Sequence, residues 1–230
     1  MILSAAQPYF APYPGFFEKM LRSDLFVILD TVQFPRGGTW MTRNRFKNDR
    51  GELWIRLPVH KKGLGLQQID RVKIVRQDQR WVDKHVSSLQ HAYRNAPFFR
   101  DHFGVLRNLF ESGLESLAEL NISLIAYVAG QCGIACRTVR LSATGIEARG
   151  TELLAALCRR YGADTLLAQS PAQKYLDPEP FAKAGIRLVF LQPKRCIYPQ
   201  LWGDFVANLS VFDLLFCCGP RAGAVLGQDL

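Results

Sequence analysis

Residues 2–17 are Ile2-Leu3-Ser4-Ala5-Ala6-Gln7-Pro8-Tyr9-Phe10-Ala11-Pro12-Tyr13-Pro14-Gly15-Phe16-Phe17, and residues 25–30 are Leu25-Phe26-Val27-Ile28-Leu29-Asp30. This order predicts a strand over 2–6, a turn rich in proline and rings, a helix over 14–22 and a strand over 25–30. Ligands of open α/β sheets bind outside the carboxyl ends of the strands. Gln7 and Asp30 are therefore candidate catalytic residues. The alternative is that the turn only connects two elements.

The rest of the chain continues this alternation. We expect a long loop over 31–50, with further strands at 53–59, 69–75, 138–141, 164–168 and 187–191. Apolar spacing predicts helices at 79–94, 97–111, 115–131, 151–161, 179–184 and 208–218. The pattern predicts an α/β fold with a mostly parallel central sheet and flanking helices. The basic strands and helices of about 31–130 form an inserted segment in this prediction, within one body that spans 1–230.

Composition narrows the class of protein. The chain has 230 residues, of which 48% are hydrophobic and 21% charged, as in ordinary globular proteins. No apolar run approaches the roughly 20 residues that span a bilayer. The first residues lack the Lys/Arg region that opens a secretory signal peptide. We expect a cytoplasmic protein without a membrane span.

Six cysteines are present, and none forms a C-x-x-C pair or has a histidine at zinc-site spacing. We therefore expect no structural zinc and no other metal site. Cys132, Cys158, Cys217 and Cys218 fall in apolar helical runs, which predicts buried, reduced thiols. A catalytic Cys–His pair stays open, because such pairs meet in space rather than in sequence. The four histidines are isolated, and we interpret each as a surface or packing residue.

The net charge of +9 is concentrated in one segment. Residues 36–76 contain eleven Lys or Arg and three acids, a net charge of +8. A field of this sign attracts phosphates, nucleic acid or an anionic membrane surface. The alternative is a solvated basic face that only aids solubility, in which an outlying residue such as Arg76 is an exposed charge.

Trp40-x-x-Arg43-Asn44-x-x-Lys47 is the most site-like part of this segment. On a helix these four residues would share one face. Arginine suits a bidentate grip on phosphate, and tryptophan offers a flat face for a ring. The alternative is a surface helix with Trp40 buried at its base. Gln33, just beyond Asp30, extends the same candidate substrate site.

Two further groups of residues complete the candidate site. Tyr9 and Tyr13 lie in the N-terminal turn, where their rings could stack on a ligand. Ser170 and Tyr175 follow the predicted 164–168 strand, where Ser170 and backbone amides could hold an anion. This loop lacks glycine, so it is no P-loop.

Seven motifs together resemble the WbqC-like protein family over residues 2 to about 221. They are Gln7-Pro8-Tyr9-Phe10-x-Pro12-Tyr13-x-Gly15-x-Phe17, Ser23-Asp24-x-Phe26-Val27-x-x-Asp30-x-Val32-Gln33-Phe34, Trp40-x-x-Arg43-Asn44-Arg45, Tyr93-x-x-Ala96-Pro97-Phe98, Gly162-Ala163-Asp164-Thr165, Tyr175-Leu176-Asp177 and Asn208-Leu209-Ser210-x-x-Asp213-Leu214-Leu215-Phe216. The resemblance implies a context of O-antigen and other surface-polysaccharide genes and a suggested aminoacyl transferase role. One departure is Gln169-Ser170-Pro171, where the family often has a Gly/Pro/Ser loop.

The basic segment predicts an anionic ligand, and the family resemblance implies a transferase of surface-polysaccharide assembly that moves a glycyl or other acyl group to a nucleotide-linked amino sugar. Arg43 and Lys47 would neutralise phosphate, Trp40 and Tyr9 would stack on a ring, Gln7 and Asn44 would fix hydroxyls, and Asp30 would act as base or amine anchor. The partner is then an anionic small molecule, and the sequence names no cofactor. The alternative is a non-catalytic binding module for nucleic acid or an anionic polymer, using the basic segment 36–76.

Overall fold

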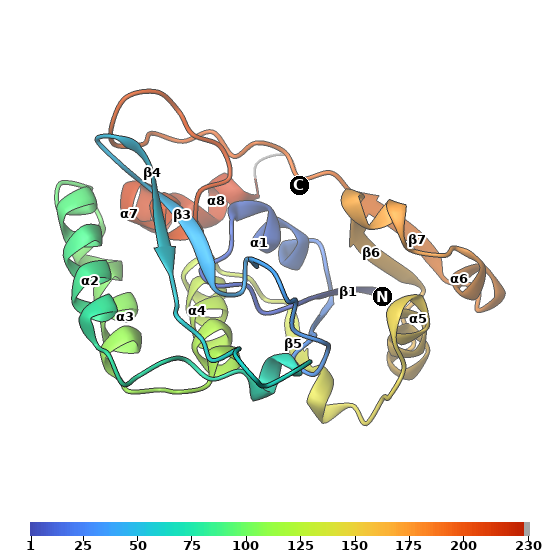
Figure 1. Ribbon diagram of the computed structural model, residues 1–230. Coiled ribbons are helices and arrows are strands. Elements are labelled where there is room, and N and C mark those ends of the chain that lie inside the picture. The colour runs from blue at the N-terminus through green and yellow to red at the C-terminus, as the bar shows by residue number, and fades with distance from the viewer. Residues whose placement is uncertain (228–230) are drawn as a thin grey trace.

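A five-stranded sheet lies at the centre of the computed structural model, which describes residues 1–227 (Figure 1). Its strands, in spatial order, are β5 (Arg137–Arg140), β2 (Leu25–Ile28), β1 (Ile2–Ala6), β6 (Thr165–Gln169) and β7 (Arg187–Leu191). Every neighbouring pair is parallel. Counted along the chain, the order is 3-2-1-4-5, as at the start of the doubly wound order 3-2-1-4-5-6. The predicted α/β fold with a parallel central sheet and flanking helices is confirmed.

Eight α-helices surround the sheet within residues 1–227. They are α1 (Pro14–Leu21), α2 (Arg80–Tyr93), α3 (Phe99–Glu111), α4 (Leu117–Gln131), α5 (Gly150–Tyr161), α6 (Glu179–Lys183), α7 (Val211–Cys218) and α8 (Ala222–Leu226). In Figure 1, α5 and α6 lie beside β6 and β7, whereas α2, α3, α4, α7 and α8 gather at the other end. The predicted helices are all present, with bounds that differ by a few residues.

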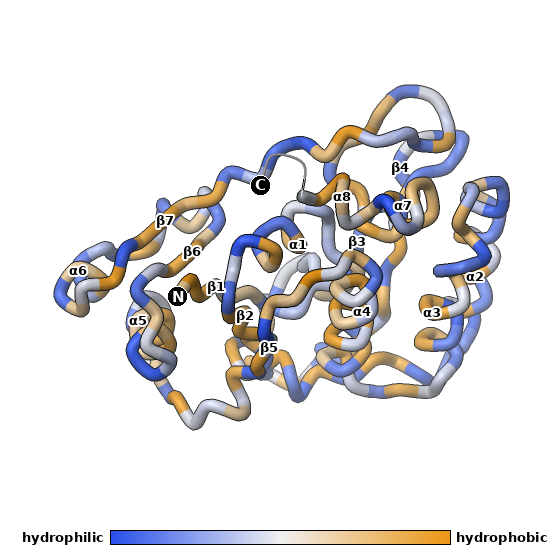
Figure 2. The backbone as a smooth tube through the Cα atoms, turned by 180° about the vertical axis from the view of Figure 1, so that it is seen from behind, coloured by the Kyte–Doolittle hydropathy of each residue, from blue (hydrophilic) through white to orange (hydrophobic). Residues whose placement is uncertain are grey.

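The two faces of the sheet bury two separate apolar clusters. Phe26 and Ile28 of β2 pack into the larger cluster, which α1, α4 and α7 also supply. Leu25 and Val27 point to the opposite face and pack into the smaller cluster with Leu3 and α5. Figure 2 shows the hydrophobic stretches that run through the central strands. Because both faces are covered, β2 is a continuous apolar run rather than an alternating one.

The segment between β2 and β5 contains a separate hairpin and three helices. β3 (Arg43–Asn48) and β4 (Gly51–Arg56) pair only with each other, as an antiparallel two-stranded sheet. The helices α2, α3 and α4 follow before the chain returns to β5, next to β2. The interpretation of 31–130 as an insertion, and of 1–230 as one domain, stays a prediction.

The helical interpretation of Trp40–Lys47 is wrong, since Arg43–Asn48 is β3. Asn44 and Phe46 are buried on the inner side, whereas Arg43 and Arg45 are partly exposed on the other. A buried amide and a buried ring two residues apart fit the period of a strand. The polar composition of this stretch hid that alternation.

The predicted strand over 69–75 is also wrong. Ile69–Arg71 forms a short 3-10 helix, and the pairing expected with 53–59 is reduced to an isolated bridge between Val59 and Ile74. The segment is held instead by several long-range backbone hydrogen bonds. Among them, the Asp70 amide donates to the Asp30 carbonyl and the Leu117 amide donates to the Val72 carbonyl. Tertiary packing against α4 therefore overrides the local alternation.

No helix within residues 1–227 has both the length and the apolar character that crossing a bilayer requires.

Lys19 on α1 is a buried cation without an acidic partner among its described contacts. Its side chain is only 3% exposed, and its ammonium donates to the Ala5 carbonyl at 2.8 Å. The rings of Phe16 and Phe26 lie 6.0 and 5.3 Å from the same nitrogen. Burial lowers the pKa of Lys19 to about 7, because the charged form loses its hydration.

We expect Lys19 to make the protein more stable as pH rises from 7 to 9. Its folded-state pKa lies below the usual 10.5, so the unfolded chain binds more protons in this window. The free energy of unfolding should then rise by about 1.4 kcal/mol per pH unit. Lys19→Met should remove this slope in urea titrations at several pH values.

The difference between wild type and Lys19→Met isolates the effect. Burial raises the pKa of several cysteine thiols, for example Cys132 to about 12, and their contribution lowers stability as pH rises toward 9 and above. Both proteins share that contribution. If the free energy of unfolding changed with pH equally in the two proteins, the lowered pKa assigned to Lys19 would be wrong.

Candidate functional site

A cavity of about 340 Å³ lies at the carboxyl ends of β1 and β6. The order of the strands reverses between these two, which is where doubly wound sheets bind their ligands. The lining side chains are mostly rings, prolines and amides, as is usual for small-molecule sites. They are Tyr9, Pro12, Tyr13, Trp40, Asn44, Arg45, Gln169, Pro171, Pro193 and Asn208.

The structure brings four of the predicted site residues together in this lining. Tyr9 and Tyr13 come from the turn after β1, Trp40 precedes β3, and Asn44 lies within β3. Trp40 is 44% exposed, so its ring is available to a ligand. The expectation that it lies buried at the base of a helix does not hold.

Tyr13 and Gln169 close the wall between the two strand ends. The Gln169 amide donates to the Tyr13 hydroxyl at 2.6 Å and to the Gly15 carbonyl at 3.3 Å. Burial raises the pKa of Tyr13 to about 12, so its hydroxyl stays protonated at neutral pH. A Cβ at Gly15 would lie 2.6 Å from the Tyr13 ring and 2.7 Å from Pro193, so this wall requires glycine.

Two buried amides fix the backbone that carries the rings. The Asn44 side chain donates to the carbonyls of Phe10 and Ala11 at 3.2 and 2.6 Å. The Asn121 side chain, on α4, donates to the carbonyls of Pro8 and Met41 at 2.8 and 2.9 Å. The role predicted for Asn44, holding a ligand hydroxyl, stays a prediction, and its amide protons already have protein partners.

Arg45 is the cation of the lining. Its guanidinium pairs with Glu52 at 2.6 Å and donates to the carbonyls of Ala207 and Asn208. Its Nε is buried and has no hydrogen-bond partner within residues 1–227. Arg45 therefore holds the 207–208 turn against the hairpin and keeps one donor unused.

Arg43 lies beside the cavity on the outer side of the hairpin. Its guanidinium stacks over Trp54 at 5.1 Å, and Arg56, opposite it on β4, stacks over the same ring at 5.7 Å. The Trp54 ring in turn stacks on Trp40, with centroids 5.9 Å apart and planes 20° apart. The result is a continuous surface of two rings and two cations that begins at the cavity lining.

Lys47 is buried away from the lining. Its ammonium donates to the Gln200 side chain at 3.1 Å and to the Asp204 carbonyl at 2.6 Å. Its backbone amide donates to the Tyr93 hydroxyl, which donates to the buried Asp213 carboxylate at 2.7 Å. Burial raises the pKa of Asp213, and Tyr93, Tyr198 and Lys47 oppose that shift. The contacts of Lys47 are those of a structural residue, and phosphate binding there stays a prediction.

Asp30, Gln7 and Gln33 also lie outside the lining. The Asp30 carboxylate is 3% exposed and accepts from the backbone amide and hydroxyl of Ser142 at 2.9 and 2.6 Å. It thereby caps the turn after β5. Gln7 is half-buried directly after β1, and Gln33 is exposed in a bridge with Gln68. Catalytic roles for Asp30 and Gln7 stay predictions.

Ser170 and Tyr175 flank the cavity from the segment after β6. The Ser170 hydroxyl donates to the Leu191 carbonyl at 2.9 Å and so joins β6 to β7. Tyr175 is 73% exposed. Burial raises the pKa of Tyr9, and Tyr175 adds to that shift, which places the two hydroxyls in the same electrostatic environment.

Arg76 is not the freely exposed charge that the sequence suggested. Its guanidinium donates to the carbonyls of Phe110 and Leu114 and stacks over Trp81 at 5.2 Å. Removing Arg76 would disturb the packing of α2 and α3. Arg50, exposed at the turn of the hairpin, is the better reference for a charge acting through the long-range field.

The four cysteines in apolar helical runs are buried, as predicted. Burial raises the pKa of Cys132 and Cys217 to about 12, which keeps these thiols protonated and weakly nucleophilic. Within residues 1–227, no cluster of three or more His, Cys, Asp or Glu side chains could hold a metal ion.

Sequence reasoning missed Arg45, Gln169 and Asn208 as cavity residues. Arg45 and Gln169 adjoin the predicted site residues Asn44 and Ser170, whereas Asn208 adjoins none of them. Arg45 follows Asn44 directly, so the period of a strand would place it on the opposite face, yet both residues line the cavity. Gln169 could have been found as the last residue of β6, since strand ends supply such sites.

The parallel sheet with its reversed strand order, and the cavity of rings and amides at the switch point, define an α/β protein of the doubly wound class. The chain belongs to the WbqC-like protein family, which matches residues 7–225. It is 30% identical over 222 residues to the uncharacterized protein Rv1507c of Mycobacterium tuberculosis, covering 96% of this chain and 95% of that protein. No solved structure matches.

We predict that Asn121→Asp destabilises the protein by more than about 3 kcal/mol. The substitution replaces an amide that donates to two buried carbonyls by a carboxylate that cannot donate to them. Urea denaturation measures the effect. Asn108→Asp on the exposed side of α3 is the matched control and should change stability by less than about 0.5 kcal/mol. An equal loss of stability at the two positions would contradict the structural role of the Asn121 hydrogen bonds.

Proposed function

We propose that the cavity receives the sugar of an anionic, nucleotide-linked amino sugar, and that the protein transfers a glycyl or other acyl group to its amine. The observation that carries this proposal is the position of a ring-lined cavity at the switch point of the sheet. The setting, assembly of a surface polysaccharide, follows from the family resemblance.

The lining suits a sugar better than a fully apolar compound. Tyr9, Tyr13 and Trp40 offer flat faces for the C–H side of a ring, and Gln169 and Asn208 offer amide groups at its edge. A volume of about 340 Å³ is at the small end for ligand pockets, which suits one sugar ring. The rest of a nucleotide-linked substrate would therefore extend over the surface outside.

The outer side of the hairpin supplies the charge that such a substrate needs. Arg43 and Arg56 lie over Trp54, whose ring stacks on Trp40 of the lining. Arginines bind phosphate oxygens in pairs of parallel hydrogen bonds. A phosphate held by Arg43 and Arg56 would place the attached sugar beside Trp40 and the mouth of the cavity.

The transfer itself forms a C–N bond from the sugar amine to the acyl carbonyl and breaks the bond from that carbonyl to its leaving group. The amine also loses a proton. Within the described part of the chain, the lining holds no carboxylate, histidine or cysteine, and the raised pKa of Tyr13 makes it a poor base. The proton would therefore pass to the leaving group of an activated acyl donor.

The surface of stacked rings and arginines beside the cavity favours a second candidate function, namely binding of an anionic polymer or nucleic acid without catalysis. Trp40 and Trp54 stack on each other, and Arg43 and Arg56 both lie over Trp54, which resembles the stacking platforms of single-strand binders. Such binding weakens steeply with salt, because many phosphates release counterions. Binding of one nucleotide-sugar in the cavity would depend less on salt.

We expect a nucleotide-linked amino sugar to raise the melting temperature in a thermal-shift screen. A ligand at ~100 times its dissociation constant adds about 2.7 kcal/mol of stability. UDP-glucosamine, UDP and free glucosamine separate the contributions of sugar and phosphate, and each sugar keeps the free amine that the proposal requires. Stabilisation by an oligonucleotide alone, with a steep loss between low and high salt, would favour the binding module.

With a ligand from that screen, Arg43→Ala should weaken binding about ten- to a hundredfold, because a charge-assisted hydrogen bond is worth roughly 1.5–3 kcal/mol. Arg50→Ala, at the exposed turn of the same hairpin, should weaken it less than about threefold. Trp40→Ala should weaken binding without changing its salt dependence, and Trp40→Phe should restore part of it. Calorimetric titrations at two salt concentrations measure all four. Equal, small losses of affinity for Arg43→Ala and Arg50→Ala would mean that the basic segment acts only through its long-range electrostatic field and has no specific phosphate site.

A further inference from the structure

A second basin lies away from the cavity, on the loops that follow the hairpin. Its volume is about 760 Å³, and it is lined by Val59, His60, Lys61, Lys62, Leu64, Gln67, Arg71, Lys73 and Val75. Four of these residues are cations and none is an acid. No residue of the candidate site contributes to it, so the proposed function does not account for it.

Part of this positive charge is not neutralised. Lys73 pairs with Glu115 at 3.0 Å, and Arg71 lies 3.8 Å from Asp70. Lys61 instead donates to the Gly37 carbonyl at 3.2 Å and lies over the Phe34 ring at 4.8 Å. The 17 residues from Leu53 to Ile69 contain no acid. The basin therefore presents a net positive surface.

The rim of the basin also exposes two large apolar side chains. Leu64 and Leu66 are 53% and 56% exposed, although leucine is usually buried. They alternate with Gly63 and Gly65, which have positive φ values of 78° and 61°. Residues with a Cβ rarely adopt this backbone conformation, so the tight loop depends on glycine at these positions. The sequence Lys61-Lys62-Gly63-Leu64-Gly65-Leu66 thus places two leucines at the tip of a loop and two lysines at its base.

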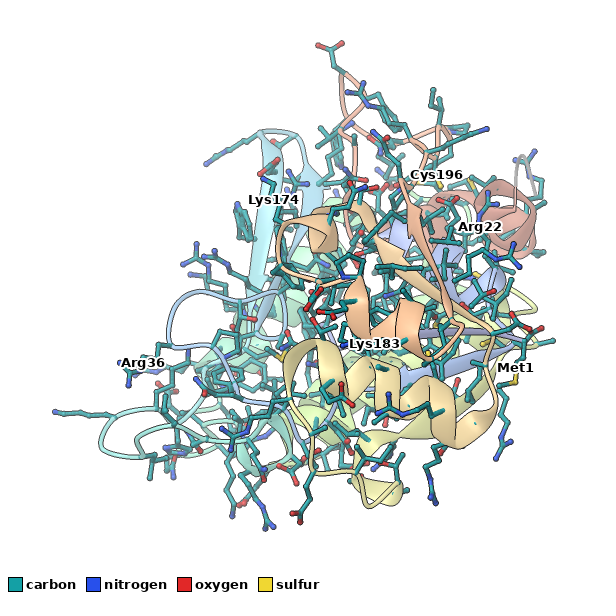
Figure 3. The ribbon with its side chains drawn as sticks, turned by 90° about the vertical axis from the view of Figure 1, so that its right-hand side faces the viewer. Met1, Arg22, Arg36, Lys174, Lys183 and Cys196 are labelled. Atoms are coloured by element: carbon teal, nitrogen blue, oxygen red, sulfur yellow. The ribbon has the colours of Figure 1, made fainter. Side chains whose placement is uncertain are left out.

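A neighbouring loop extends this surface. Figure 3 shows Arg36 at the edge of the molecule, with its side chain directed away from the body. The hydrogen bond from Lys61 to Gly37 joins the loop that carries Arg36 to the loop of the two leucines. Arg36 is exposed, so a flat anionic surface that meets Leu64 and Leu66 could also meet this cation.

We propose that the loop 61–66 and its surrounding cations dock the protein on an anionic phospholipid surface. Leu64 and Leu66 enter the interface between headgroups and acyl chains, as the apolar side of a peripheral anchor does. Lys61, Lys62 and Arg36 contact lipid phosphates, each strengthening binding about fivefold near a negatively charged leaflet. Apolar tips beside cations favour a bilayer over a soluble polyanion, which offers no apolar phase.

Sedimentation with vesicles tests the proposal on the full chain. Wild type should bind vesicles of equal phosphatidylcholine and phosphatidylglycerol, and should not bind phosphatidylcholine alone. Lys61→Gln/Lys62→Gln should weaken binding by roughly twentyfold and flatten its salt dependence. Leu64→Ser/Leu66→Ser should weaken it about tenfold, because two partly inserted apolar side chains are lost, and should leave the salt dependence unchanged, because no charge is lost.

Matched controls distinguish the loop from a general surface effect. Arg94→Gln/Arg100→Gln removes the same charge from exposed positions on and beside α2 and α3, and Ile197→Ser removes an apolar side chain that is 70% exposed. Both should bind like wild type. Lys61 is half-buried and the other altered residues are exposed, and thermal melting checks that each variant is folded.

Three results would overturn the proposal. Equal losses of vesicle binding for the lysine pair and the arginine pair would mean that only the overall positive charge of the protein attracts the vesicles. Displacement from vesicles by inorganic phosphate at low millimolar concentration would mean a site for free phosphate. Tight binding of a single-stranded oligonucleotide that Leu64→Ser/Leu66→Ser leaves unchanged would mean a nucleic-acid surface.

Discussion

The two amide clamps of Asn44 and Asn121 are the constraint on which the candidate site depends. They donate four hydrogen bonds to carbonyls of Pro8, Phe10, Ala11 and Met41. Pro8 and Pro12 have no backbone N–H, so this turn has fewer donors than acceptors and cannot form a regular ladder of backbone hydrogen bonds. Buried carbonyls in such a turn need side-chain partners, and the two amides supply them from β3 and α4. Segments far apart in sequence thereby form one rigid rim.

The same clamps explain why the rim can hold an unfavourable backbone. Ala11 has a φ of 41°, which a residue with a Cβ adopts at a cost. Its carbonyl is fixed by Asn44 at 2.6 Å, and the next residue's carbonyl, of Pro12, accepts from the Val211 amide. The N-terminus of α7 is thus joined to the turn after β1. Positioning of Tyr9 and Tyr13 is a property of the whole fold rather than of their own segment.

The central sheet and its helices could be predicted from the sequence, because apolar runs and helical spacing are local signals. Of the separate hairpin, the sequence predicted only the second strand, as part of 53–59. Arg43-Asn44-Arg45-Phe46-Lys47-Asn48 alternates only if a buried asparagine counts as inward-facing, and that depends on carbonyls over thirty residues away. For the same reason the cavity was half predicted. Tyr9, Tyr13, Trp40 and Asn44 were chosen for their chemistry, whereas Gln169 and Asn208 line it through contacts that close across the chain.

The distribution of acids decides how the site could work. The buried carboxylates of Asp30 and Asp213 both make structural hydrogen bonds. Asp30 caps the turn after β5, and Asp213 accepts from the Tyr93 hydroxyl, which in turn accepts from the Lys47 amide of the hairpin. Neither carboxylate lines the cavity. Among the lining residues that the structure describes, the cation is Arg45, and its guanidinium is paired with Glu52. Chemistry in such a pocket depends on how it orients its reactants, since aligning two groups can itself supply much of a rate enhancement. Buried amides hold the backbone of this rim, and in the proposed transfer the rim would orient the amino sugar toward a donor that is already activated.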